Sequence, residues 1–198
     1  MTLLYFFGFA LLGYLCGSLP FSIWITRLVK GVDVRDSGSG HATTTNTIRQ
    51  AGFVPGAAVF ILDTAKGFIP IYLSFHFAPL WITPITVACV VIGHCWPLFA
   101  QFRGGMGLAC AGGGLLVVSP LSVLVLAAVL IVLVLLTRHP ARASVFTGVV
   151  ASPLLWIFNQ RGIEFWIAVA AGIVIAYRFL IDWNRHYHEL WLDRKKPE

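Results

Sequence analysis

Long apolar runs alternate with short polar stretches along this chain of 198 residues. The apolar runs cover residues 3–26, 53–75, 80–100, 107–118, 121–137, 143–158 and 165–181. Most of them approach or exceed the roughly 20 residues that a helix needs to cross the hydrocarbon core of a bilayer. The pattern predicts an all-α integral membrane protein with about seven transmembrane segments, of which the fourth is short.

The short fourth segment depends on a break at Ser119-Pro120. The apolar stretch 107–136 is too long for one simple span. Proline removes a helix hydrogen-bond donor and clashes with the preceding turn. We therefore expect two limbs, near 107–118 and 121–137.

Composition and cysteine usage narrow the class of protein further. The chain is 58% hydrophobic and 11% charged, whereas soluble domains are nearer half apolar and a quarter charged. Residues 1–198 are therefore expected to form a single polytopic membrane domain. No basic segment precedes the first apolar run, and Arg27 and Lys30 follow it, which favours a retained first helix over a secretory signal. The four cysteines show no paired spacing, so neither a disulfide nor a metal site is predicted.

The basic residues predict an orientation. With the N-terminus outside, only Arg161 falls on the outer side, and Lys66 lies within a span. Twelve basic residues then face the cytoplasm: Arg27, Lys30, Arg35, Arg49, Arg103, Arg138, Arg142, Arg178, Arg185, Arg194, Lys195 and Lys196. This bias places the C-terminus and the polar loops in the cytoplasm. The net charge of +6 is either this bias alone or in part a means of holding an anion. Nucleic-acid binding is not expected, because there is no basic helix.

A first polar stretch, residues 38–49, lies between two apolar runs. Glycine lets a backbone approach an anion closely and form a concave nest of N–H groups, and arginine offers a planar fork suited to phosphate. The stretch combines such groups with hydroxyls and an amide: Gly38, Ser39, Gly40, Thr43, Thr44, Thr45, Asn46 and Arg49. It predicts a phosphate site at the membrane surface. The alternative is a flexible turn that caps the next helix.

A second polar stretch, residues 93–107, contains His94 and then Arg103-Gly104-Gly105-Met106-Gly107. Three glycines at the start of a helical limb favour a backbone cradle for an anion, because a helix N-terminus adds partial positive charge. The alternative is close helix packing through glycine. His94 either packs, contacts phosphate or transfers a proton.

Charged residues elsewhere leave two alternatives open. Asp63 and Lys66 lie three residues apart on one face of a span, where ionisable groups pair with each other or mark a site. A second group lies at the ends of two later spans: Arg138, Arg142, Ser144, Arg178 and Arg185. These residues either belong to the site or are the ordinary basic flanks of membrane helices.

Taken together, these motifs resemble the bacterial acyl-phosphate:glycerol-3-phosphate acyltransferase family, whose members are small seven-span membrane enzymes. The family motif G-S-G-N-x-G-A-T-N-x-x-R is matched at Gly38, Ser39, Gly40, Thr45, Asn46 and Arg49. L-D-x-x-K-G-x-x-P and G-H-x-x-P are matched at Leu62, Asp63, Lys66, Gly67, Pro70, Gly93, His94 and Pro97. The glycine-rich motif is matched at Phe102, Arg103, Gly104, Gly105, Gly107, Leu108 and Ala109.

Several positions depart from the family pattern. His41 stands for an asparagine, Met106 for a lysine and Cys110 for a threonine. After the last span Arg185 matches, but a histidine and an asparagine are replaced by Phe179 and Asp182. Loss of a lysine that faces phosphate would lower affinity or rate by about one to two powers of ten, because a charge-assisted hydrogen bond contributes roughly 1.5–3 kcal/mol. Further departures are Thr43, Thr44 and Ala141.

The resemblance implies transfer of a fatty acyl group from acyl phosphate to the 1-hydroxyl of glycerol 3-phosphate, giving lysophosphatidic acid and phosphate for phospholipid synthesis, with no cofactor or metal. It implies a bacterial inner-membrane location, a cytoplasmic active face and a nearby enzyme that produces acyl phosphate. The implied catalytic residues are Ser39, Asn46, Arg49 and His94. The implied substrate-binding residues are Gly38, Gly40, Thr45, Lys66, Arg103, Gly104, Gly105, Gly107, Ser144 and Arg185.

The sequence leaves two other functions as alternatives. Met106, Phe179 and Asp182 motivate a non-catalytic member that binds a lipid phosphate or a partner protein. A small-solute carrier is disfavoured, because the polar groups gather at one membrane face rather than at the midplane.

Overall fold

The computed structural model describes residues 1–185 and contains only helices and loops in that range. Arg194, Lys195 and Lys196, which contribute to the predicted orientation, lie outside the described residues. The helices are α1 (Thr2–Gly17), α2 (Phe21–Lys30), η1 (Val34–Asp36), α3 (Thr44–Ala51), α4 (Phe53–Phe77), α5 (Ile82–Cys95), η2 (Leu98–Ala100), α6 (Leu108–Val118), α7 (Pro120–Thr137), α8 (Pro140–Ile157) and α9 (Ile163–Leu180). The all-α class is confirmed.

Six helical segments in the described range are long and apolar enough to cross a membrane. They are Thr2–Lys30, Phe53–Phe77, Ile82–Ala100, Pro120–Thr137, Pro140–Ile157 and Ile163–Leu180. The predicted short segment is the 11-residue helix α6. At 1.5 Å per residue it extends about 16 Å, roughly half of a 30 Å hydrocarbon core.

The predicted break after α6 is confirmed. Ser119 has an extended backbone, and its Oγ accepts a hydrogen bond of 3.1 Å from the N–H of Ser122. Pro120 occupies the first position of α7, where its missing N–H would have no helical partner in any case. A serine cap and a proline therefore end one helix and begin the next.

The predicted first span, 3–26, lies within the apolar segment Thr2–Lys30, which the structure divides into α1 and α2. The chain breaks at Leu19-Pro20, because proline cannot donate a helical hydrogen bond and disfavours helical geometry at the residue before it. Lys66 of α4 donates from Nζ at 2.8 Å to the carbonyl of Leu19, which also accepts from the N–H of Phe21 at 3.2 Å, and pairs with Oδ1 of Asp63 at 2.8 Å. The charged pair in the second span is thus mutual, and it ties α4 to the break.

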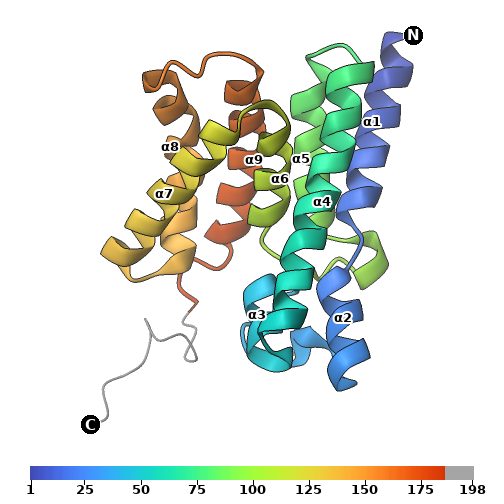
Figure 1. Cartoon of the computed structure of the whole chain (residues 1–198), viewed down its shortest axis with the longest axis vertical. Coiled ribbons are helices and arrows are strands. Elements are labelled where there is room, and N and C mark those ends of the chain that lie inside the picture. The colour runs from blue at the N-terminus through green and yellow to red at the C-terminus, as the bar shows by residue number, and fades with distance from the viewer. Residues whose placement is uncertain (186–198) are drawn as a thin grey trace.

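The helices form a bundle in which α1, α4 and α5 lie on one side and α7, α8 and α9 on the other, with α6 between them (Figure 1). Close contacts depend on glycine. A side chain at Gly17 of α1 would overlap the carbonyl of Val90 in α5, and one at Gly67 of α4 would overlap the carbonyl of Cys110 in α6. Small residues allow such approach in lipid, where association relies on packing.

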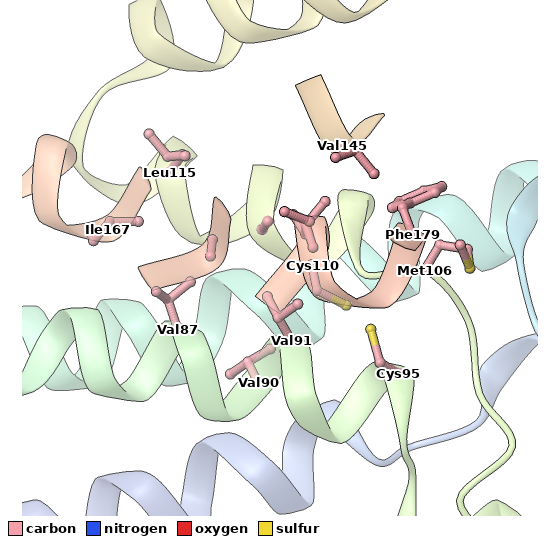
Figure 2. Close-up of a cluster of buried hydrophobic side chains, with 14 of the residues drawn as sticks. Val87, Val90, Val91, Cys95, Met106, Cys110, Leu115, Val145, Ile167 and Phe179 are labelled. Atoms are coloured by element: carbon pink, nitrogen blue, oxygen red, sulfur yellow. The ribbon is translucent and has the colours of Figure 1, made fainter. Parts of the chain in front are cut away.

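The main buried cluster lies where α5, α6 and α9 meet, with Val145 of α8 added at its edge (Figure 2). The polar stretches lie at the end of the bundle opposite the N-terminus, where α2, α3 and the end of α9 are found (Figure 1). The fold therefore brings the first polar stretch, the second polar stretch and the residues after α9 to one end.

Candidate functional site

Asn46 organises the first polar stretch from within. Its side chain is fully buried, and Nδ2 lies 2.6, 3.1 and 3.1 Å from the carbonyl oxygens of Val34, Ser37 and His41. Its Oδ1 accepts a 3.3 Å hydrogen bond from the N–H of Ser39. This differs from the expected contact between Asn46 and phosphate, because the amide is engaged by the backbone of its own loop.

The same stretch also caps a helix, as the alternative reading expected. Thr43 accepts a hydrogen bond of 3.2 Å at Oγ1 from the N–H of Asn46 and so begins α3. Capping and ligand binding are not exclusive here, because Ser39 and Arg49 still face a cavity described below.

An ion pair fastens the segment before the first polar stretch. Arg35 Nη2 lies 2.8 Å from Oδ2 of Asp33, and its Nη1 donates to the carbonyl of Ala100 at 2.8 Å. The hydrogen bond from Arg35, opposed by burial and assisted by the charges of Arg35 and Arg27, lowers the pKa of Asp33 to about 2. This carboxylate is therefore charged throughout the physiological range.

Two of the three glycines in Arg103-Gly104-Gly105-Met106-Gly107 have backbone N–H groups that are already hydrogen-bonded within the protein. The N–H of Gly104 donates to the carbonyl of Cys95 at 3.2 Å, and that of Gly105 donates to the carbonyl of His94 at 3.0 Å. A side chain at either glycine would overlap His94. The prediction that these two N–H groups bind acyl phosphate is corrected, because the end of α5 already accepts them.

Gly104→Ala should therefore act on stability. The added Cβ would overlap backbone oxygen, and overpacking costs about 1–3 kcal/mol, so the thermal midpoint in detergent should fall. Gly112→Ala is the matched control, since a Cβ there meets no atom within 4 Å. A Gly104→Ala protein of unchanged stability that no longer responds to phosphate would instead support the cradle.

The two polar stretches share one cavity of about 500 Å³. Of the predicted site residues, six line it: Ser39, Thr45, Arg49, His94, Gly107 and Ser144. Gly107 has φ +84° and precedes α6, whose first N–H groups have no partner within the helix and favour an anion. Further lining residues are His41, Thr43, Thr44, Asp63, Met106 and Phe179.

The other predicted residues do not line this cavity: Gly38, Gly40, Asn46, Lys66, Arg103, Gly104, Gly105 and Arg185. Gly38 and Gly40 have φ of +62° and +68° and shape the turn before α3. Arg103 is exposed and offers its carbonyl to Arg35 at 3.3 Å. These residues therefore lie outside the cavity wall, and Gly38, Gly40 and Arg103 shape or support the loops around it.

A second cavity of about 300 Å³ continues from the first between α4, α6, α7, α8 and α9. Five residues line both cavities: Phe60, Leu108, Ala109, Leu130 and Ser144. The walls of the second cavity are almost entirely apolar, with Leu115, Leu126 and Ala168 among them. We call this second cavity the apolar groove. No sequence motif indicated it, because its lining is ordinary helix residues that happen to face one space.

Asp63, His94 and Cys110 form a buried cluster whose potential metal-ligand atoms lie within 4.8 Å of one another. The Nζ of Lys66 lies 2.8 Å from Oδ1 of Asp63, whereas Nδ1 of His94 lies 3.7 Å from the same oxygen. A lysine ammonium already neutralises this carboxylate, so we describe the cluster as an ion pair and assign no metal to it.

Three side chains that sequence reasoning did not combine meet behind Ser39. His41 of the first polar stretch, Arg178 of α9 and Asp182 after α9 are each buried. Burial raises the pKa of the Asp182 carboxyl, but the hydrogen bond from His41 and the charges of Arg178 and Arg185 outweigh it, so the pKa lies below its ordinary value. More than 130 residues separate His41 from Arg178 and Asp182 in sequence, and no local pattern reports such a contact.

Six apolar helical segments of spanning length within residues 1–185, with a cavity that is polar at one end and opens into an apolar groove, define a multi-pass membrane protein able to hold an amphiphilic ligand. A family described as glycerol-3-phosphate acyltransferase matches residues 7–189. The chain belongs to this family.

Individual relatives agree with the assignment. The chain is 40% identical over 188 residues to a glycerol-3-phosphate acyltransferase of Myxococcus xanthus, covering 93% of this chain and 94% of the relative. It is 34% identical over 182 residues to one of Fusobacterium nucleatum, covering 91% and 93%. A crystal structure of PlsY (YgiH), an integral membrane glycerol 3-phosphate acyltransferase in its glycerol 3-phosphate form, superposes with a TM-score of 0.79 at 34% identity and 90% coverage of both chains.

Proposed function

We propose that this protein transfers a fatty acyl group from acyl phosphate to the 1-hydroxyl of glycerol 3-phosphate, forming lysophosphatidic acid and inorganic phosphate. One observation carries the proposal: a polar cavity that contains Arg49 opens directly into an apolar groove. Both the donor and the product are amphiphiles with a phosphate near one end. PlsY has been crystallised in glycerol 3-phosphate and lysophosphatidic acid forms, which agrees with this substrate.

The cavity residues divide into groups that bind charge and groups that bind the chain. Arg49 can pair with phosphate through a charge-assisted, bidentate hydrogen bond, and the hydroxyls of Ser39 and Ser144 can donate beside it. Gly107 leaves the N-terminus of α6 open for a second anion. The acyl tail lies in the apolar groove, where burial of each methylene contributes about 0.8 kcal/mol.

The chemistry requires positioning more than side-chain bases. The 1-hydroxyl oxygen attacks the carbonyl carbon, the bond from that carbon to the phosphate oxygen breaks, and phosphate leaves with the electron pair. The hydroxyl proton passes to a phosphate oxygen, so the leaving group serves as proton acceptor. Orientation and charge stabilisation supply the rate enhancement. His94, on the same cavity wall, is a candidate hydrogen-bond donor to the carbonyl oxygen.

We infer the membrane orientation from charge. With the N-terminus outside and α6 counted as a short seventh segment, the polar stretches and the cavity face the cytoplasm, where the basic residues gather. The membrane is then the bacterial inner membrane. An acyl phosphate donor must be supplied by an enzyme that makes acyl phosphate on the same side.

Purified protein should convert labelled glycerol 3-phosphate to lysophosphatidic acid when given palmitoyl phosphate, with one phosphate released per product. Palmitoyl-coenzyme A in place of palmitoyl phosphate should give no product. Product from the thioester alone would overturn the donor assignment. Folded protein that is silent with both donors would overturn the enzymatic function.

A further inference from the structure

His41 is held at both ring nitrogens. Its Nε2 lies 2.7 Å from Oδ2 of Asp182, and its Nδ1 lies 3.2 Å from Nη2 of Arg178. Arg185 lies beside the pair, with Nη1 3.5 Å from Oδ1 of Asp182 and 3.0 Å from Nε2 of His41. Two guanidinium groups therefore surround a single carboxylate and a single imidazole.

The partners of His41 hold its ring from both sides. Nδ1 faces the guanidinium of Arg178, which can only donate. Nε2 faces the carboxylate of Asp182, which can only accept, and the guanidinium of Arg185. These contacts on both ring nitrogens fix the ring in one orientation. An imidazole that is contacted at both ring nitrogens is poorly placed to act as a base.

These contacts join three separate parts of the site. Arg178 also donates from Nε to the carbonyl of Gly105 at 3.2 Å, so α9 is bound to the second polar stretch as well as to the first. Nearby, the N–H of Ala42 donates to the carbonyl of Gly104 at 3.2 Å. Ser39, two residues before His41, lies on the cavity wall. Its position depends on where His41 is held.

We propose that His41, Arg178 and Asp182 act as one positioning unit that fixes the first polar stretch against the second and so sets the phosphate-binding geometry. The proposal rests on the proposed function. None of the three is assigned a catalytic step. His41 and Asp182 are both departures from the family pattern, and their direct contact implies that the two changes depend on each other.

Two further departures near the site also lie together. Met106 and Phe179 belong to one buried cluster (Figure 2) and both line the polar cavity. One pair of positions is therefore apolar, whereas the other pair carries hydrogen bonds and charge. We therefore assign the positioning of the two polar stretches to His41 and Asp182, because the side chains of Met106 and Phe179 offer no hydrogen bond that could hold the stretches together.

A double-mutant cycle tests the unit. His41→Ala and Asp182→Ala should each lower kcat/KM for glycerol 3-phosphate about tenfold, measured per folded molecule. The double variant should be no more than about threefold below the worse single variant, because residues that share one network are not additive. His41→Gln, whose amide can still donate to Asp182, should recover part of the His41→Ala loss.

Asp33→Asn provides the matched control, because Asp33 is also in an ion pair with arginine but does not contact His41. Its effect should add to that of His41→Ala. Variants that lose thermal stability but keep wild-type kcat/KM in the folded fraction, or that combine additively, would overturn the unit. If the alanine variants do not fold, the same cycle is run with His41→Gln and Asp182→Asn.

Binding separates failure of this unit from failure of the proposed function. Glycerol 3-phosphate should raise the thermal midpoint of the wild-type protein, and His41→Ala and Asp182→Ala should reduce that rise. If the wild-type protein makes no product yet shows this pattern, the enzymatic function fails and the unit stands. If wild-type turnover is normal and the variants bind and turn over like wild type, only the unit fails.

Discussion

Arg49→Ala should lower kcat/KM for glycerol 3-phosphate by about a hundredfold and abolish the stabilisation of the protein by this substrate. Of the lysine and arginine side chains in residues 1–185, Arg49 alone lines the polar cavity. A charge-assisted hydrogen bond contributes about 1.5–3 kcal/mol, and a bidentate guanidinium–phosphate pair makes two. The position that the family fills with lysine is Met106 here, so no second lysine or arginine among residues 1–185 lines the cavity to compensate.

Two controls sharpen this test. Arg161→Ala removes the same charge from an exposed arginine in the loop between α8 and α9, and it should leave turnover and substrate stabilisation unchanged. Arg49→Lys keeps the charge but loses the planar fork, so it should recover only part of the loss. Wild-type kcat/KM in Arg49→Ala would remove this residue from the site and leave the helix N-terminus as the anion subsite.

The breaks in the helices show what the sequence could and could not predict. The helix break at Pro120 could be predicted because the apolar run around it is too long for one span. Pro20 has the same physical effect, but the run around it has the length of a normal span, so nothing in the pattern required a break. The structural consequence, a hydrogen bond from Lys66 to the carbonyl of Leu19, depends on a helix more than 40 residues away.

The polar stretches show a second limit. Their residue types predicted donors at one membrane face, and the structure does place Ser39, Arg49 and Gly107 around one cavity. Which donors remain for a ligand could not be predicted, because that depends on partners in space. Asn46 and the N–H of Gly105 are donors of the expected kind, yet the protein itself uses both.

The departures from the family pattern are the clearest case. In the sequence alone, Asp182 places a negative charge near a site that is predicted to bind anions. In the structure it lies 2.7 Å from His41 and faces Arg178 and Arg185, which offset its charge. A substitution that looks damaging alone is thus accommodated by a second substitution and two arginines, and only the fold reveals that they meet.

Filling the apolar groove with a side chain at Gly112 should change the acyl chain selectivity of the protein, and this is the second large effect. The consecutive glycines of α6 have three different surroundings. A side chain at Gly113 would overlap the carbonyl of Thr64, and one at Gly114 would crowd Val87 and Ile71, but one at Gly112 would meet no atom within 4 Å. Gly112 lines the groove, so its missing side chain leaves room for the chain of the substrate.

Gly112→Leu should therefore select against long donors. Gly112 lies four residues beyond Leu108, where the polar cavity and the groove meet, or about 6 Å along the helix axis. A leucine there should reduce turnover with palmitoyl phosphate at least tenfold and leave octanoyl phosphate largely unaffected, since the shorter tail passes less of the blocked region. Gly8→Leu, at another glycine whose Cβ would meet no atom within 4 Å, should change neither. Equal loss with both donors in Gly112→Leu would mean that the acyl chain does not follow this groove.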